Sequence, residues 1–163
     1  MIISTADLVK IRRKTIMADG CFDPLHYGHI AYFKFAAGFG KPVLCNVETD
    51  RYIIDAKKRS PLLPETQRIQ VIDAFKYITY THLQTTTTSD VLRQLQPLKY
   101  IKGTDWKNKI LPEDELETCK KYGIEIVYTN KNLDSSTALI KRFGRNLKQP
   151  FQSFTDKLYL LFI

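Results

Sequence analysis

Short apolar runs alternate along the chain with segments of helical period, and this alternation predicts the fold. Five runs have the length and apolar content of buried strands. They are residues 15–18, 42–48, 78–83, 99–103 and 124–128. Because a helical segment separates the strands, they are expected to be parallel and joined by crossover helices. The pattern therefore predicts a doubly wound α/β fold with a five-stranded parallel sheet.

The helices are predicted from their apolar positions and their end signals. Their expected ranges are 2–13, 30–37, 64–75, 91–95, 112–122 and 132–143. The helix after Pro112 has acidic residues in its first turn, as the helix dipole favours, and ends at Gly123. Ser89 and Asp90 are expected to cap the helix at 91–95. In a sheet of this kind the ligand site lies beyond the carboxyl ends of the strands.

The chain has the size and composition of one globular domain. It contains 163 residues, of which 44% are hydrophobic and 26% charged. No apolar stretch reaches the roughly 20 residues of a membrane span, and three widely spaced cysteines favour reduced thiols in a cytoplasm. We expect a domain at residues 1–143 and a tail at 144–163. The apolar end of the tail, residues 158–163, is expected to pack on the domain or across a homodimer.

The formal net charge of +8 has two interpretations. Nucleic acid is a common partner of basic domains, but the sequence contains no recognised nucleic-acid-binding module. A binding site for phosphorylated small molecules also requires local positive charge. Basic clusters occur at residues 12–14, 57–59, 107–109 and 141–148. We expect most of these side chains to be solvated, and we expect neither nucleic acid nor a membrane as a partner.

The candidate chemistry lies in residues 19–29, where the first predicted strand ends in a loop and a helix begins. The sequence there is Asp-Gly-Cys-Phe-Asp-Pro-Leu-His-Tyr-Gly-His. A helix start presents unpaired N–H groups and the positive end of its dipole, which favour a phosphate. His26 and His29 lie three residues apart and therefore share one face of the first turn. Gly28, which has no side chain, lets a ligand approach the backbone.

This stretch resembles the signature of the HxGH nucleotidyltransferase superfamily, and within it the cytidylyltransferase-like family of glycerol-3-phosphate cytidylyltransferases and heptose-1-phosphate adenylyltransferases. The resemblance implies a Rossmann-like nucleotidyltransferase fold and catalytic roles for His26 and His29. It also implies nucleotide contacts from Gly20, Cys21, Phe22, Asp23 and Gly28. The alternatives are two histidines satisfied in a core, or an H-x-x-H metal pair, for which His82 is the only other histidine.

A basic loop and the helix start that follows it resemble a further part of the family pattern. In the family, this part holds the acceptor phosphate and the triphosphate. The resemblance implies a catalytic role for Lys57 or Lys58, and acceptor or phosphate contacts from Arg59 and Arg68. Taken alone, such a charge run is more often a solvated loop.

The segment 102–106, Lys-Gly-Thr-Asp-Trp, is similar to two relatives at once. The heptose adenylyltransferases have K-G-G-D-Y, and the glycerol-phosphate cytidylyltransferases have G-D-D-W. The resemblance implies nucleotide-binding roles for Lys102, Gly103, Asp105 and Trp106, with Asp105 accepting a hydrogen bond from the exocyclic amine of the base. The alternative for Trp106 is an ordinary core position.

Residues 134–137, Asp-Ser-Ser-Thr, resemble the I-S-T-T or C-S-T-T of the family. The resemblance implies that Ser135, Ser136 and Thr137 bind the β and γ phosphates, and an ordinary helix cap is the alternative. The family has R-T-x-G before this motif, where this chain has Asn-Lys-Asn-Leu at 130–133. The arginine contact is therefore missing or passes to Lys131. Asp134 would be unfavourable beside phosphates unless it faces away or meets a metal.

The reaction implied by the resemblance is attack by an acceptor phosphate on the α-phosphorus of a nucleoside triphosphate, with release of pyrophosphate. Mg²⁺ is expected, held by phosphates and water and by no dedicated protein ligands. Asp105 and Trp106 favour CTP with a phosphorylated polyol or sugar such as glycerol 3-phosphate. Lys102 and Gly103 favour ATP with heptose 1-phosphate or a similar sugar phosphate. A non-catalytic nucleotide-binding regulatory protein is the third hypothesis, and the presence of both histidines, the basic loop and the Ser/Thr helix start argues against it.

Overall fold

The structure is a computed structural model that describes residues 1–107, 110–130 and 136–146. Its strands are β1 (Ile2–Ile3), β2 (Ile16–Gly20), β3 (Val43–Glu48), β4 (Tyr80–Gln84), β5 (Lys99–Lys102) and β6 (Glu125–Tyr128). Its α-helices are α1 (Tyr27–Ala37), α2 (Asp50–Lys57), α3 (Glu65–Asp73), α4 (Thr88–Leu95), α5 (Glu113–Tyr122) and α6 (Ser136–Asn146). Two 3₁₀ helices are η1 (Thr5–Ile11) and η2 (Thr104–Trp106). None of the helices in the described ranges has the length and apolar content needed to span a bilayer.

The strands form one parallel sheet in the order β1-β4-β3-β2-β5-β6. From β2 the chain adds β3 and β4 on one side, and then crosses to add β5 and β6 on the other. Ile16 of β2 accordingly pairs with Val43 of β3 and with Lys99 of β5. In an open α/β sheet a ligand crevice forms at this reversal, beyond the carboxyl ends of the strands. The doubly wound parallel fold predicted from the sequence is confirmed.

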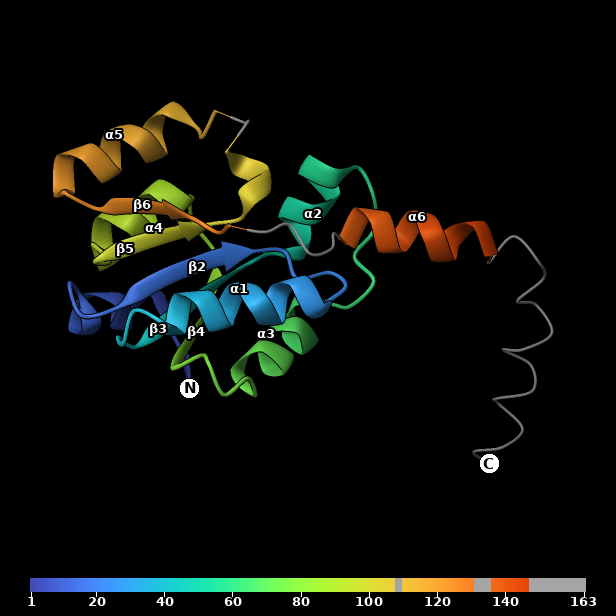
Figure 1. The fold of residues 1–163 in the computed structure, drawn as a ribbon, viewed down its shortest axis with the longest axis horizontal. Helices are drawn as coiled ribbons and strands as arrows, with labels where there is room; N and C mark the ends of the chain where they lie inside the picture. Colours follow the sequence, from blue (N-terminus) through green and yellow to red (C-terminus); the bar gives the residue numbers. More distant parts are fainter. Residues whose placement is uncertain (108–109, 131–135, 147–163) are drawn as a thin grey trace.

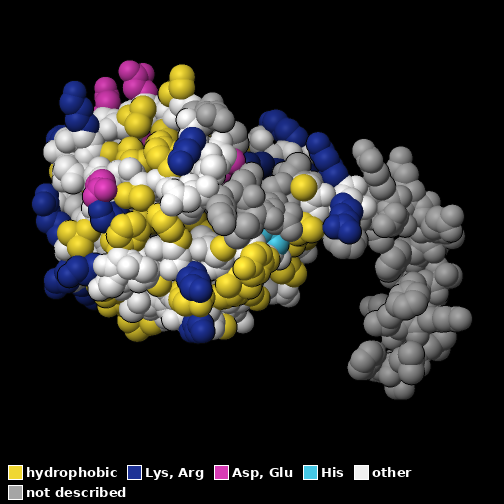
Figure 2. Space-filling view, viewed as in Figure 1, with side chains coloured by type: hydrophobic (Ala, Val, Ile, Leu, Met, Phe, Trp, Pro, Cys, Tyr) yellow, Lys and Arg dark blue, Asp and Glu magenta, His cyan; other side chains and the backbone are white. Residues whose placement is uncertain are grey.

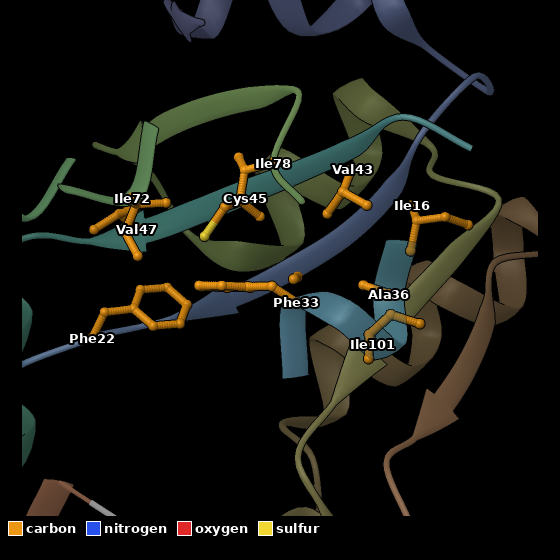
Figure 3. Close-up of a cluster of buried hydrophobic side chains, with 11 residues drawn as sticks. Ile16, Phe22, Phe33, Ala36, Val43, Cys45, Val47, Ile72, Ile78 and Ile101 are labelled. Carbon is orange, nitrogen blue, oxygen red and sulfur yellow. The ribbon is translucent and has the colours of Figure 1, made fainter. Parts of the chain in front are cut away.

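Helices lie on both faces of the sheet (Figure 1). Alternate residues of β2 and β3 contribute to a separate core on each face. Ile16 and Ala18 of β2 face α1 and α3, where Phe33 lies against Phe22 (Figure 3). Met17, between them, faces the opposite core formed with η1, α4 and α5. Burying one large apolar side chain contributes about 1.5–3 kcal/mol. A slip of one residue would reverse both faces, so the alternation fixes the register of the strand.

The N-terminal segment differs from the prediction. Residues 2–13 were expected to form one short helix, but Ile2 and Ile3 form the edge strand β1 and pair with Thr81 and His82 of β4. The sheet therefore has six strands where the sequence pattern predicted five. A two-residue strand is too short to show the alternation by which strands are recognised.

Helices α2 and α4 also differ from the prediction. Helix α2 lies in a stretch for which the sequence pattern predicted no helix, and Thr49 caps it by accepting a hydrogen bond from the Tyr52 amide at 3.2 Å. Helix α4 begins at Thr88, so Ser89 and Asp90 lie inside the helix and do not cap it. The cap is Thr87, whose hydroxyl accepts from the Asp90 amide at 3.1 Å. Every threonine of the run 85–88 has a side chain that can cap a helix, so the residue type alone does not fix where α4 begins. The start of α4 is decided by the spacing between the cap and the apolar positions of the helix.

Candidate active site

A pocket of about 590 Å³ opens at the carboxyl edge of the sheet, where the strand order reverses. The ends of β2, β3 and β5 form its base, and the starts of α1, α5 and α6 contribute to its walls. Figure 2 shows Lys and Arg side chains gathered over α2 and along α6 beside it. The pocket brings together most of the predicted residues: Gly20, Cys21, Phe22, Asp23, His26, Gly28, His29, Lys57, Arg59, Lys102, Gly103, Asp105, Trp106 and Ser136.

The two histidines of the loop form a stacked pair at the start of α1. His26 is the residue before the first helical turn, and its ring stacks on that of His29 with centroids 3.7 Å apart. The His26 backbone N–H donates to Nδ1 of His29 at 3.2 Å. Burial, followed by the charge of His26, lowers the pKa of His29 to about 3. His29 is therefore neutral at pH 7 and carries its proton on Nε2, which is a donor suited to a phosphate oxygen.

The ring of Phe22 packs against the ring of His29. Its ring meets the edge of the His29 ring at a centroid distance of 5.0 Å and packs on Phe33 at 5.2 Å. Its backbone φ is 52°, which is an unusual conformation for a residue with a side chain. The surrounding packing holds this conformation, so the loop presents His29 in one fixed orientation.

Asp23 fastens the histidine loop to the basic loop. Its buried carboxylate accepts from Arg59 Nη1 at 2.5 Å and from the backbone N–H groups of Leu62 and Leu63 at 2.9 Å. Arg59 also donates from Nη2 to the Asp23 carbonyl at 2.6 Å. Asp23 lines the pocket while its carboxylate is bonded within the protein. Arg59 keeps a part-exposed side chain in the pocket wall.

Arg68 differs from its predicted role as a phosphate ligand. Its side chain is fully buried and lies outside the pocket lining of the described residues. The guanidinium donates to the carbonyls of Cys21, Glu48 and Leu63 at 2.7 to 3.0 Å and to Asp50 Oδ1 at 2.7 Å. Arg68 therefore joins the ends of β2 and β3 to the start of α2, which holds the pocket in shape.

The basic loop offers one lysine to the pocket. Lys57, the last residue of α2, lines the pocket, whereas Lys58 is the left-handed residue after the helix and does not line it. Cys21 also lines the pocket, and burial raises the pKa of its thiol to about 11. The thiol is thus protonated at pH 7 and is no nucleophile. All three cysteines are free.

The segment after β5 bends into the pocket through η2. Thr104 anchors the bend, because its N–H donates to Thr129 Oγ1 at 3.0 Å. A Cβ added to Gly103 would come within 2.5 Å of Asp105 Oδ1, so glycine permits the approach of this carboxylate. Trp106 is half-buried in the pocket wall, with the Lys102 ammonium 4.4 Å from its ring centroid.

The last predicted element begins at α6. Ser136 donates from its hydroxyl to the Pro24 carbonyl at 2.9 Å and so joins the start of α6 to the histidine loop. Thr137 lies in the first turn of the same helix. Lys131, Asp134 and Ser135 lie outside the described residues, as does the tail from residue 147 onward.

Several pocket residues were not predicted from the sequence. Asp19, Glu48 and Glu115 line the pocket floor, and Tyr100 lies beneath them. Asp19 belongs to the stretch 19–29 in which the sequence placed the candidate chemistry, but no role was assigned to its side chain. Glu48 ends the predicted strand 42–48, and its place at a strand end was a usable signal. Nothing in the local sequence of Glu115 distinguishes it from a surface glutamate. Within the described ranges, no three His, Cys, Asp or Glu side chains are grouped to hold a metal ion.

Comparison with known proteins identifies the class. The family model described as "Cytidylyltransferase-like" matches residues 17–143, which is more than half of the chain. The chain therefore belongs to the cytidylyltransferase-like family, as the motif around the two histidines predicted.

Among similar proteins is the bifunctional protein HldE of Citrifermentans bemidjiense, which is 33% identical over 96 residues, 58% of this chain and 20% of the relative. The protein of the same name from Gluconobacter oxydans is 29% identical over 79% of this chain and 27% of its own length. The chain thus spans about a quarter or less of these relatives. A lipopolysaccharide core biosynthesis protein from Thermoplasma volcanium has a similar structure, with TM-score 0.61, 26% identity, and coverage of 72% of this chain and 97% of that one.

Proposed function

We propose that the chain is a nucleotidyltransferase that transfers a nucleoside monophosphate from a nucleoside triphosphate to a phosphorylated polyol or sugar. A phosphate oxygen of the acceptor attacks the α-phosphorus, the bond from that phosphorus to the bridging oxygen breaks, and pyrophosphate leaves with the electron pair. No covalent intermediate with the protein is required. Positioning and charge stabilisation supply most of the catalysis in such transfers.

The observation that carries the proposal is the stacked histidine pair at the start of α1, which opens into the same pocket as Lys57 and Ser136. Neutral His29 donates from Nε2 to a phosphate oxygen as negative charge moves toward the leaving group. The N–H groups of the first turn of α1 and the ammonium of Lys57 add to the same stabilisation. These donors are fixed before the reaction, so little reorganisation is needed in the transition state.

The experiment that tests the proposal is a pyrophosphate-release assay with a panel of nucleoside triphosphates and phosphorylated acceptors. We expect release that requires both substrates. Binding of a nucleotide without release for any acceptor would favour a non-catalytic nucleotide-binding protein instead.

The base is the finer part of the proposal. The Asp105 and Trp106 side chains in the pocket wall favour CTP, by resemblance to glycerol-phosphate cytidylyltransferases, and the similarity to HldE proteins favours ATP as the second candidate. Calorimetry with CTP and ATP in the presence of Mg²⁺ tests this choice. Clearly tighter ATP binding would overturn the CTP assignment.

We also propose that Mg²⁺ enters with the triphosphate and is held by its phosphates and by water, because the described residues supply no three-ligand group. The three free thiols support a reducing, cytoplasmic location. A homodimer remains part of the proposal, with the apolar tail as the expected contact. Light scattering of the full chain, and of a chain truncated before residue 151, tests the dimer.

A further inference from the structure

The floor of the pocket is a buried group of charged side chains that the proposed transfer of the nucleotide does not use. Asp19 is the next-to-last residue of β2, Glu48 ends β3, Lys102 ends β5, and Glu115 lies in the first turn of α5. All four line the pocket, yet Lys102 is 4%, Glu48 6% and Glu115 8% exposed. Charged groups are rarely buried unless they pair with one another or await a ligand.

Lys102 occupies the position that a cationic ligand would take. Its ammonium donates to Asp19 Oδ2 at 3.0 Å and to the Tyr100 hydroxyl at 2.8 Å. It also lies 4.4 Å from the ring centroid of Trp106 and 4.7 Å from that of Tyr100. A carboxylate and aromatic faces are the groups that bind a ligand ammonium. Because the protein supplies this cation itself, a second one is excluded from the same position by repulsion.

Glu48 is held as a hydrogen-bond acceptor by a chain of donors from outside the pocket. Thr5 Oγ1 lies 3.0 Å from His82 Nε2, and His82 Nδ1 lies 2.7 Å from Asn46 Oδ1. The Asn46 amide donates to Gln84, whose own amide donates to Glu48 Oε2 at 2.9 Å. Burial lowers the pKa of His82 to about 4, so the ring is neutral and fits this sequence of donors and acceptors.

Glu115 is oriented by a shorter set of contacts. Its Oε2 lies 3.1 Å from the Tyr100 hydroxyl, which is 2.5 Å from Asp19 Oδ2. The hydrogen bonds of Glu48 to Gln84 and of Glu115 to Tyr100 both use Oε2 of the carboxyl group. Burial is the main cause that raises the pKa of both carboxyl groups, and the ammonium of Lys102 offsets this rise only in part.

We propose that this floor is an acceptor subsite in which Glu48 and Glu115 accept hydrogen bonds from hydroxyl groups, while Lys102 excludes amino-alcohol phosphates. The inference rests on the proposed function, since it names the acceptor class for the same reaction. The acceptor is a phosphate ester whose organic part is uncharged and carries several hydroxyl groups. Asp19 and the chain from Thr5 to Gln84 act as positioning residues. This arrangement gives Lys102 a role toward the acceptor, in place of the nucleotide contact implied by the resemblance.

The first test compares four acceptors with the full chain: glycerol 3-phosphate, glucose 1-phosphate, O-phosphoethanolamine and phosphocholine. We expect pyrophosphate release with at least one of the first two, at about 100-fold higher kcat/KM than with either amino-alcohol phosphate. Efficient transfer to the amino-alcohol phosphates would overturn the subsite but leave the nucleotidyl transfer intact. If none of these four compounds and no other phosphorylated acceptor gave pyrophosphate release, the proposed function would be overturned.

Calorimetric binding of the same four compounds keeps the inference testable without turnover. Tighter binding of the hydroxyl-bearing pair supports the subsite. Tighter binding of the amino-alcohol phosphates, equal binding of all four, or no binding of any would overturn it.

The second test uses isosteric variants of the floor. At pH 8, above the folded pKa of Glu48, Glu48→Gln and Glu115→Gln should each raise the KM of the hydroxyl-bearing acceptor by about 10-fold or more, the loss expected for a hydrogen bond to a charged group. The KM of the nucleotide should stay within about 2-fold. Glu117→Gln, an exposed position on the same helix, is the matched control. Equal changes in both KM values would contradict a role confined to the acceptor.

The third test removes the internal cation. Lys102→Met leaves Asp19 and Trp106 in place and should improve binding of O-phosphoethanolamine relative to glycerol 3-phosphate by about 10-fold. Lys99→Met, at the other end of β5, is the control and should change neither. An unchanged preference in folded Lys102→Met would count against the exclusion, and the glutamate variants test the subsite if that protein does not fold.

Discussion

The two ends of the pocket are built in different ways. At the rim, the phosphate groups would meet the first turn of α1, the exposed Lys57 and the start of α6, all of which are backbone ends or side chains that reach into solvent. At the floor, Lys102 and Glu48 are buried, Asp19 is half-buried, and all three are already bonded to one another or to an amide. The rim offers free donors, and the floor offers acceptors that are held in position.

This difference follows from what each end has to bind. A triphosphate brings several charges of its own, so a rim of solvated donors and helix ends can neutralise it without a desolvation penalty in the empty site. Hydroxyl groups are neutral and bind strongly only to acceptors that are already desolvated and oriented. We therefore expect variants at the rim to act on turnover, and variants at the floor to act on acceptor binding and on stability.

The largest effect is expected from the histidine pair. His26→Ala and His29→Ala should each reduce kcat by about 100-fold or more, because each removes a fixed donor to developing charge. Circular dichroism and thermal unfolding should show an intact fold. Tyr27→Ala is the matched control, since Tyr27 lies between the two histidines but is 67% exposed and does not line the pocket. Near-normal pyrophosphate release in either histidine variant would contradict the site.

The basic loop provides a second, smaller test of the rim. Lys57→Ala should lower kcat/KM by about 10-fold, since it removes one charge near the phosphates, whereas Lys58→Ala should change it by less than about 3-fold. Steady-state kinetics with the best substrate pair measures both. The two lysines are neighbours in sequence and equal in charge, so a general loss of positive potential would affect them alike. Equal losses would therefore argue against a specific contact from Lys57.

The sequence predicted the rim because the rim is made of contiguous segments. Residues 20–29 contain a strand end, a loop and a helix start in a single run, and the class of the chain followed from that run. The five strands β2 to β6 were also predicted, since each is long enough to show its apolar content. The two-residue β1 and the helix α2 were missed, because one is too short and the other has only one buried residue, Ile53.

The floor could not be predicted in the same way. Glu48, Lys102 and Glu115 come from separate elements, and only the strand order β3-β2-β5 brings them together. Arg68 illustrates the opposite error, because a basic residue near a basic loop suggested a phosphate contact. Its burial and its bonds to three backbone carbonyls became evident only from the fold.

The turn after β5 tests how closely the two ends of the pocket depend on each other. Gly103→Ala places a Cβ within 2.5 Å of Asp105 Oδ1, so the carboxylate has to move. We expect the KM of the nucleotide to rise about 5-fold, with the KM of the acceptor within about 2-fold. Thr104→Ser, which retains the hydroxyl bonded to Thr129, is the control at the next position. A change in the acceptor KM alone would place Asp105 at the floor.

The last prediction concerns the stability of the floor as a function of pH. Burial, followed by the charge of Asp19, raises the pKa of Glu48 from 4.5 to about 7 in the folded protein. Lys102 lowers that pKa in part, whereas Glu115 raises it further, and Tyr52 and Cys21 also face Glu48. Between pH 4.5 and 7 the folded state holds a proton that the unfolded state has lost. The free energy of unfolding therefore falls as the pH rises through this window.

Glu48→Gln removes this titration and retains the shape of the side chain. Relative to the wild type, the variant should become more stable on going from pH 5 to pH 8, by about 2 to 3 kcal/mol at roughly 1.4 kcal/mol per pH unit. Urea unfolding of both proteins at the two pH values measures the difference. Buried His82 contributes equally to both proteins and cancels in the comparison. Glu117→Gln should show no such trend, because that side chain is exposed. If the difference in the free energy of unfolding between Glu48→Gln and wild type stayed constant with pH, the pKa of Glu48 would not be raised by burial. The contrast between the two ends of the pocket would then rest on their hydrogen bonds alone.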